Sequence, residues 1–313
     1  MAIQNQIIQY LPADRYIEFL RGASDGISGS THLANVQWGD GVERESWVKL
    51  YAANKPRSLA NEMIGYLLGR ALNLPMPPQA GFLLIENKVL NPNFVNLLSD
   101  VDRYRGFTFA WVTEDVKGQN LRMEIKDNPV NQNIMIDYFK RCMRDWEQLS
   151  SLIAFDDWIL NSDRNMGNSI HLPDRTFCLI DHGECMNGGE WKESQLLDPD
   201  CAHVGFAENI HLRLLHEKHK SAGLFQLEHT MTELDKAKQE HFNAIKLVEL
   251  EIQEHLNDLI GDELIDTGID SIEPYPVTET VLNFLTNRAQ HVEKFSERCD
   301  TFFSTQSLTR PMS

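Results

Sequence analysis

The first third of the chain alternates between short apolar runs and turn signals, a pattern that predicts strands. Residues 35–38 and 46–51 are candidate strands on either side of a Gly-Asp-Gly stretch, which is typical of a hairpin turn. Apolar runs at 81–85 and 107–112 predict two further strands that are buried. We therefore expect this portion to form a β-sheet.

One helix is expected within this portion, over residues 57–72. Its apolar residues recur every four positions and share one face: Leu59, Met63, Leu67 and Ala71. The proline-rich stretch 74–78 ends the helix, because proline has no amide hydrogen to donate and its ring clashes with the preceding turn.

Helical periodicity dominates after Val112. It is clear over 133–160, and the positions that carry it are Ile136, Phe139, Cys142 and Trp146. A short hairpin is predicted from 169–172 and 177–180. Two long helices are expected beyond it, over 226–260 and 277–304.

This order of elements predicts an α+β fold with two lobes. We expect a small strand-rich N-lobe at 1–112 and a larger helical C-lobe at 113–313, connected near 110–114. Ligands commonly bind in the cleft between two such parts.

Charge and cysteine content narrow the classes of partner. The chain has 313 residues, and 29 basic against 46 acidic residues give a net charge of −17. This charge repels the phosphates of nucleic acids and anionic membrane surfaces, so we expect neither as a direct partner. The 5 cysteines contain no CxxC pair, which argues against a disulfide framework or structural zinc. No apolar run is typical of a signal peptide or a membrane span, which predicts a cytoplasmic protein.

Acidic and amide side chains are concentrated in residues 155–168, and the motif Leu-Ile-Asp-His-Gly follows at 179–183. Asp163 stands five residues before Asn168, the spacing that protein kinases use between the loop aspartate and a metal-binding asparagine. Asp181 directly follows an apolar run. Phosphoryl transfer needs a carboxylate near the attacking hydroxyl and hard oxygen ligands for Mg²⁺. Any one of these residues is an ordinary turn former, but their combined spacing favours this chemistry.

The motifs resemble those of HipA-like kinases and, more distantly, of phosphoinositide and protein kinases. The residues that carry the resemblance are Phe155-Asp156-Asp157-Trp158, Asn161-Ser162-Asp163-Arg164, Gly167-Asn168 and Leu179-Ile180-Asp181-His182-Gly183. The resemblance implies that Asp163 is the catalytic base and that Asn168 and Asp181 ligate Mg²⁺. Asn165 stands where many relatives have histidine, which weakens a lipid-kinase interpretation.

The N-terminal portion supplies two charged residues that fit the same chemistry. Lys49 lies in the alternating segment 47–51, from which it is expected to reach the α- and β-phosphates of a nucleotide. Glu62 follows thirteen residues later on the predicted helix and is expected to pair with Lys49, as the strand lysine and helix glutamate of kinases do. A lone lysine or glutamate is more often a solvated surface residue, so this interpretation depends on the downstream motif.

Two further segments are candidate nucleotide contacts. Residues 22–30 are rich in glycine and serine, and we expect the loop's Ser28, Gly29 and Ser30 to cover the phosphates. The loop matches neither common phosphate-loop motif, and an ordinary flexible loop fits equally well. Residues 107–112 are expected to connect the lobes and to bind adenine through backbone groups, with Phe109 and Trp111 in contact. A buried core strand is compatible with that expectation.

The sequence thus predicts a HipA-like serine/threonine kinase, a transferase that moves the γ-phosphoryl group of ATP to an alcohol with the help of Mg²⁺. Asp156 and Asn161 are expected to hold the catalytic loop in place. The resemblance implies a protein substrate and an antitoxin-like protein partner. Two alternatives stay open: a small-molecule or lipid kinase on the same scaffold, and a nucleotide-binding pseudokinase that acts as an interaction module.

Overall fold

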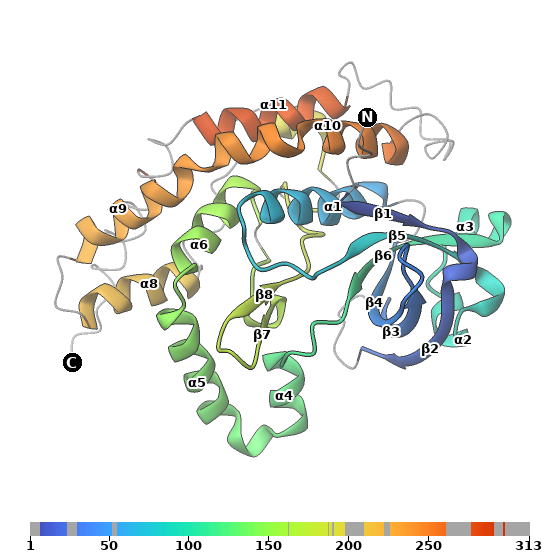
Figure 1. Ribbon diagram of the computed structural model, residues 1–313, viewed down its shortest axis with the longest axis horizontal. Coiled ribbons are helices and arrows are strands. Elements are labelled where there is room, and N and C mark those ends of the chain that lie inside the picture. The colour runs from blue at the N-terminus through green and yellow to red at the C-terminus, as the bar shows by residue number, and fades with distance from the viewer. Residues whose placement is uncertain are drawn as a thin grey trace.

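The structure is a computed structural model. It describes residues 7–23, 30–51, 55–161, 163–186, 188–189, 191–197, 210–221, 226–260, 277–290 and 297. A strand-rich part comes first along the chain and a helical part follows, so the predicted α+β architecture is confirmed (Figure 1). Ser28 and Gly29 of the predicted phosphate loop lie outside the described residues.

The strand-rich part is built on a six-stranded sheet in the order β1-β5-β6-β4-β3-β2. The strands are β1 (Ile8–Leu11), β2 (Tyr16–Gly22), β3 (Thr31–Gln37), β4 (Glu43–Tyr51), β5 (Ala80–Glu86) and β6 (Phe107–Glu114). β1 pairs in parallel with β5, and the remaining pairs are antiparallel. The short helices α2 (Pro92–Val95) and α3 (Asp100–Arg105) lie between β5 and β6 in the chain.

The two faces of the sheet pack against different parts of the molecule. Val48 and Leu50 of β4 pack with Ala110 and Val112 of β6 in a core on one face. Because side chains alternate along a strand, Lys49 points to the opposite face, toward helix α1 (Pro56–Ala71) and the helical part. The alternation of β4 therefore decides that Lys49 faces the interior of the molecule.

Two strands, β1 and β2, were not predicted. β2 is an edge strand, and most of its side chains are exposed or half-buried, so it lacks the clean alternation of a strand with one buried face. Its register with β3 also shifts, between Tyr16 and Glu18 and between Phe19 and Arg21. An apolar pattern is a poor guide to such a strand.

Helix α1 lies between the sheet and the C-terminal helices (Figure 1). Every residue from Ser58 to Gly69 is buried, so the helix has no solvent-facing side. The predicted helix is confirmed. Its apolar residues suggested one buried face, whereas the structure buries the helix on all sides. Its polar residues Asn61 and Glu62 are consequently interior groups that need partners.

The helical part contains longer helices and a hairpin, and its elements are α4 (Leu121–Asp127), α5 (Gln132–Asp145), α6 (Leu149–Trp158), β7 (Ser169–His171), β8 (Phe177–Leu179), α7 (Glu193–Leu196), α8 (Ile210–Ser221), α9 (Gln226–Gln239), α10 (His241–Ile260) and α11 (Val277–Gln290). Short 3-10 turns lie at Ala13–Arg15, Asn87–Val89, Pro129–Asn131 and Met166–Asn168. The predicted hairpin is confirmed.

Two predicted long helices are each divided in two. The helical stretch 133–160 breaks at Trp146, whose extended backbone ends α5. Trp146 is buried against Phe177 of the hairpin, at 5.4 Å between ring centroids. The stretch 226–260 breaks at Glu240, because α9 packs against α6 whereas α10 packs against α1. Most of the predicted extension of α11 beyond Gln290 lies outside the described residues.

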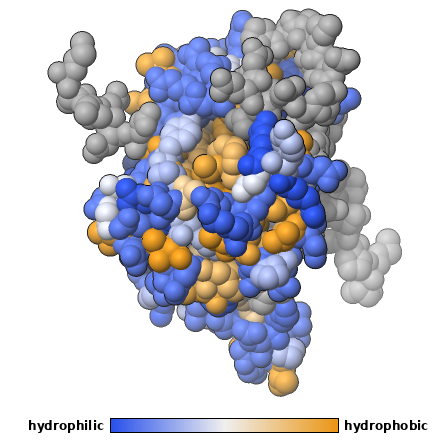
Figure 2. All heavy atoms as spheres, turned by 90° about the vertical axis from the view of Figure 1, so that its right-hand side faces the viewer, coloured by the Kyte–Doolittle hydropathy of each residue, from blue (hydrophilic) through white to orange (hydrophobic). Residues whose placement is uncertain are grey.

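The surface of the described part carries both hydrophilic and hydrophobic side chains. Figure 2 shows a face that is largely hydrophilic, with hydrophobic side chains gathered toward its middle. Among the described helices, none has the length and apolar composition required to cross a bilayer.

Candidate active site

A cleft of about 900 Å³ opens between the sheet and the helical part. Its walls come from β4, α1, the segment after β6, the loop before β7 and the segment after β8. Its lining includes seven of the residues singled out from the sequence: Ser30, Lys49, Glu62, Trp111, Asp163, Asn168 and Asp181. Residues far apart in the chain thus meet in one concave place.

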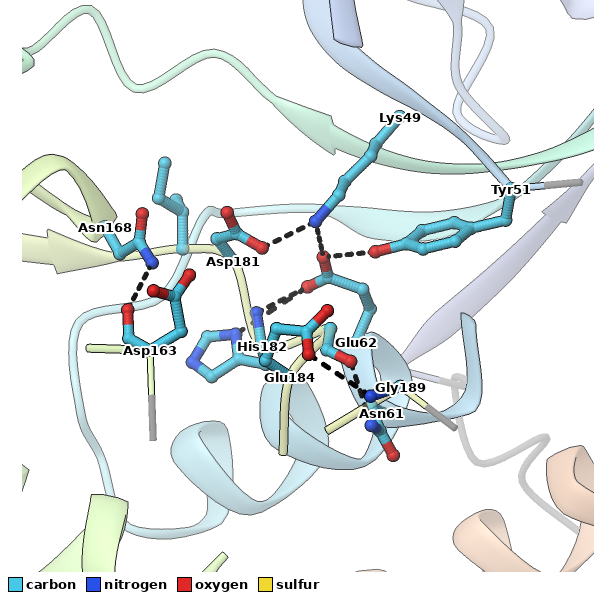
Figure 3. Close-up of polar contacts among 12 residues, drawn as sticks. Lys49, Tyr51, Asn61, Glu62, Asp163, Asn168, Asp181, His182, Glu184 and Gly189 are labelled. Atoms are coloured by element: carbon cyan, nitrogen blue, oxygen red, sulfur yellow. Dashed lines mark hydrogen bonds and ion pairs between the residues drawn. The ribbon is translucent and has the colours of Figure 1, made fainter. Parts of the chain in front are cut away.

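Lys49 is the centre of the polar network in this cleft (Figure 3). Its Nζ lies 2.9 Å from Oε1 of Glu62 and 2.5 Å from Oδ1 of Asp181. The predicted Lys49–Glu62 pair is therefore present, and the lysine links strand β4 to α1 and to the segment after β8. Burial alone would lower the pKa of Lys49, but the charges of Glu62 and Asp181 outweigh it and hold that pKa well above its ordinary value.

Glu62 is almost fully buried, and its carboxylate has three polar partners. Besides Lys49, the Tyr51 hydroxyl donates to Oε1 at 2.9 Å, and the backbone N–H of His182 donates to Oε2 at 2.8 Å. Burial and the charge of Glu62 raise the pKa of Tyr51 well above its ordinary value, so the phenol stays a donor. Tyr51 was missed from the sequence. Strand alternation places it on the same face as Lys49, and that signal was available.

Asp181 follows β8 in an uncommon backbone conformation. Its φ is +59°, in the left-handed region that aspartate tolerates better than most residues. Gly183 fits tightly beside it, because an added Cβ there would lie 2.6 Å from the Tyr51 hydroxyl and 3.3 Å from Nζ of Lys49. The turn after β8 thus brings Asp181 to Lys49 without blocking the cleft.

Asp163 and Asn168 come from the loop between α6 and β7. The Asp163 N–H donates to Oδ1 of Asn161 at 3.2 Å, and Nδ2 of Asn168 donates to the Asp163 carbonyl at 2.9 Å. The Asp163 side chain is exposed, whereas Asn168 is buried. Both lie beside Asp181 in Figure 3. Oδ1 of Asp163 accepts from Nδ2 of Asn165 at 3.4 Å, so the loop presents an exposed carboxylate next to the amide of Asn168.

A buried ion pair supports this loop from behind. Nε of Arg164 lies 3.1 Å from both carboxylate oxygens of Asp156, and its Nη1 donates to the carbonyls of Asn168 at 2.9 Å and Ile180 at 2.8 Å. Nδ2 of Asn161 also donates to Asp156 at 3.3 Å. Burial raises the pKa of Asp156 to about 6, although Arg164 pulls it down. The contacts agree with the expected holding role of Asp156 and Asn161, while the part played by Arg164 was not predicted.

The connection between the two parts differs from the prediction. Residues 107–112 are not a connecting segment, because they lie within β6, which pairs with β4 on one side and β5 on the other. The backbone groups around Phe109 and Trp111 are thus engaged in the sheet. Trp111 lines the cleft, but Phe109 packs against the core. The connection begins at Asp115, and Val116 and Gly118 line the cleft there.

Near this connection the cleft has an aromatic side chain that was not predicted as a site residue. Trp47 lines the cleft, and its indole N–H donates to Oδ1 of Asp115 at 3.1 Å. The Arg21 guanidinium lies 5.3 Å from its ring centroid. Ser30 of the predicted phosphate loop also lines the cleft and is buried.

The side-chain oxygens of Asn168 and Asp181 are of a kind that suits Mg²⁺ better than a transition metal. Within the described ranges, no three His, Cys, Asp or Glu side chains are grouped so that they would hold a metal by themselves. Asn168 and Asp181 instead offer an amide oxygen and a carboxylate, and Mg²⁺ usually takes few protein ligands together with phosphate oxygens and water.

Comparison with solved structures finds kinases. A crystal structure of the proinflammatory kinase CtkA from Helicobacter pylori is similar at a TM-score of 0.47 and 11% identity, over 96% of this chain and 100% of that chain. The MAP kinase LmaMPK10 from Leishmania major is similar at a TM-score of 0.25 and 13% identity, over 96% of this chain and 87% of that chain. No protein-family model matches the chain. No curated protein matches it either.

Proposed function

We propose that this protein is an ATP- and Mg²⁺-dependent phosphotransferase that acts on an alcohol, as a HipA-like serine/threonine protein kinase does. One observation carries the proposal: Nζ of Lys49 contacts both Glu62 and Asp181 in a cleft that Asp163 and Asn168 also line. Active kinases require this combination of a strand lysine paired to a helix glutamate and a metal-binding aspartate nearby.

Lys49 is the proposed phosphate-positioning residue. Its high pKa keeps the ammonium charged, and Glu62 holds it at a fixed place in the cleft. A charge fixed before the reaction stabilises the developing negative charge without reorganisation. Glu62 is therefore proposed to orient Lys49.

Asn168 and Asp181 are the proposed magnesium ligands. Nδ2 of Asn168 donates to the Asp163 carbonyl, which turns the amide oxygen of Asn168 away from that bond and leaves it available. Lys49 contacts one carboxylate oxygen of Asp181, and no described donor is bonded to the other. A bound Mg²⁺ would neutralise phosphate charge at this point.

Asp163 is the proposed catalytic base. Its side chain is exposed at the cleft, and its backbone is held on both sides by Asn161 and Asn168. A carboxylate so placed is suited to accept the proton of an incoming hydroxyl.

The nucleotide base is proposed to lie near Trp47 and the connection that begins at Asp115. An aromatic face stacks on any base, and Val116 and Gly118, which follow Asp115 in the chain, also line the cleft. Ser28, Gly29 and Ser30 stay predicted phosphate contacts. The division into lobes at 112/113 also stays a prediction, and β6 continues to Glu114.

The proposal is tested by incubating the intact protein with γ-labelled ATP and Mg²⁺, with itself, cell-lysate proteins or a metabolite mixture as acceptors. We expect label on protein hydroxyls and a loss of transfer of roughly 10²- to 10⁴-fold in Asp163→Asn, the range for a general base. Asp174→Asn is the matched control, because Asp174 lies in the β7–β8 turn, accepts from Thr176 there and does not line the cleft.

Each other outcome selects an alternative. Label on metabolites but not on proteins would indicate a small-molecule or lipid kinase. ATP binding without transfer, unchanged in Asp163→Asn, would indicate a pseudokinase. Failure to bind ATP with Mg²⁺ would end the proposal.

A further inference from the structure

The segment that follows Asp181, residues 182–197, lies along helix α1. We refer to its described residues as the post-Asp181 segment. Its contacts with α1 include the ion pair between the half-buried Arg57 and the buried Glu193, at 2.9 Å between Nη2 and Oε1. The position of Asp181 therefore depends on how firmly this segment is held.

Asn61 makes most of the hydrogen bonds between α1 and this segment. Its Nδ2 donates to the carbonyls of Gly183 at 2.9 Å and Cys185 at 2.8 Å, with Gly188 farther away at 3.3 Å. Its Oδ1 accepts from the indole N–H of Trp191 at 3.0 Å. The side chain is 0% exposed, so water cannot replace these partners.

The chemistry of the partners fixes the orientation of this amide. Backbone carbonyls only accept hydrogen bonds, and an indole N–H only donates. The NH₂ group of Asn61 must therefore face Gly183 and Cys185, and its oxygen must face Trp191. No other common side chain of this size supplies two donors and one acceptor in that arrangement, so the position is specific for asparagine.

Neighbouring residues on α1 connect Asn61 to Lys49, the proposed phosphate-positioning residue. Glu62, next in the chain, accepts from the His182 N–H and from Lys49. One turn later, Gly65 allows His182 to pack closely, because an added Cβ would lie 2.4 Å from Cβ of His182. One helix therefore sets both the lysine and the residues on either side of Gly183.

We propose that Asn61 is a positioning residue: it fastens the post-Asp181 segment to α1 and so fixes Asp181 relative to Lys49 and Glu62. This inference rests on the proposed phosphotransferase function. Asn61 is not among the residues that line the cleft in which nucleotide and acceptor are proposed to bind. Its loss therefore impairs the alignment of Asp181 more than it impairs nucleotide binding.

The test compares Asn61→Ala with Asn87→Ala. Asn87 is a matched control, since its Nδ2 also donates to a backbone carbonyl, that of Asp102 at 2.8 Å, but neither residue lines the cleft. We expect Asn61→Ala to lower kcat by about 10²-fold, the effect of a displacement of about 1 Å, with KM for ATP changed only a few-fold. Asn87→Ala should keep kcat within about twofold of the parent.

Amide hydrogen exchange gives a readout that does not require activity. Peptides from 182–197 should exchange faster in Asn61→Ala than in the parent or in Asn87→Ala, while peptides of the sheet stay unchanged. If the parent shows no transfer, the proposed function fails, yet the exchange result still decides whether Asn61 holds the segment.

Asn61→Asp adds a pH dependence and also serves if Asn61→Ala does not fold. The introduced carboxylate faces carbonyl oxygens and repels them, whereas its protonated form donates one hydrogen bond. Burial favours the protonated form. The ratio of the variant's kcat to that of the parent should therefore rise as pH falls from 8 to 6. Parent-like kcat and exchange in either variant, or equal losses in Asn61→Ala and Asn87→Ala, would overturn the proposal.

Discussion

Replacing Arg164 by methionine should make the stability of this protein strongly dependent on pH. Arg164 and Asp156 are both almost fully buried, and the guanidinium also donates to the carbonyls of Asn168 and Ile180. Removing one partner of a buried ion pair costs about 3–5 kcal/mol in the free energy of unfolding, because the remaining carboxyl must either stay charged without a partner or take up a proton.

The pH dependence follows from Asp156. Burial already raises the pKa of Asp156 in the folded protein to about 6, and its ordinary value is 3.8. Without Arg164 that pKa rises further, so the folded variant keeps its proton between pH 6 and 8 while the unfolded chain has lost it. The folded state then binds the extra proton, so its stability falls as pH rises, by about 1.4 kcal/mol per pH unit. In the parent, most of this loss is complete by pH 7.

We therefore expect the destabilisation by Arg164→Met to be about 2 kcal/mol larger at pH 8 than at pH 6. Urea unfolding at pH 6, 7 and 8, followed by tryptophan fluorescence, measures it. The control is Arg164→Met combined with Asp156→Asn, which has no carboxyl to titrate and should show no such slope. A destabilisation by Arg164→Met that is the same at all three pH values would refute the reasoning.

Three further predictions concern the cleft. Glu62→Gln keeps the volume but removes the charge that orients Lys49, so kcat should fall roughly 10²-fold in a steady-state transfer assay, and a parent-like kcat would contradict its role. Trp47→Ala should raise KM for ATP about tenfold with a smaller change in kcat, since base stacking on an aromatic ring contributes about 1–3 kcal/mol. Gly183→Ala should lower kcat, because its Cβ would meet the Tyr51 hydroxyl at 2.6 Å; a parent-like kcat would count against the tight fit.

Local sequence pattern was sufficient for the central strands and for α1. The alternation of β4 turned Lys49 to the interior face, and the four-residue spacing in α1 located the helix that carries Glu62. The spacing of Asp163, Asn168 and Asp181 identified three residues that line one cleft. Each of these signals depends on neighbours within a few residues, which sequence displays directly.

Other features depended on partners distant in the chain. The breaks at Trp146 and Glu240 arise because successive helices pack against different neighbours, which periodicity within the stretch does not reveal. Residues 107–112 form a strand, as predicted, but they do not also serve as the expected connection, because β4 and β5 pair with them on both sides. An apolar run is expected both in a central strand and in a connecting segment, so the pattern does not distinguish them.

The sequence by itself determined which side chains have the chemistry for phosphoryl transfer. Its alternation along β4 also determined to which face of the sheet Lys49 points. Only the tertiary structure decided which of them meet: Asn61 is joined to carbonyls more than 120 positions away, and Arg164 to the end of β8. The physical reason is that burial obliges these polar groups to find partners, and the partners are selected by packing across the molecule rather than by order along the chain.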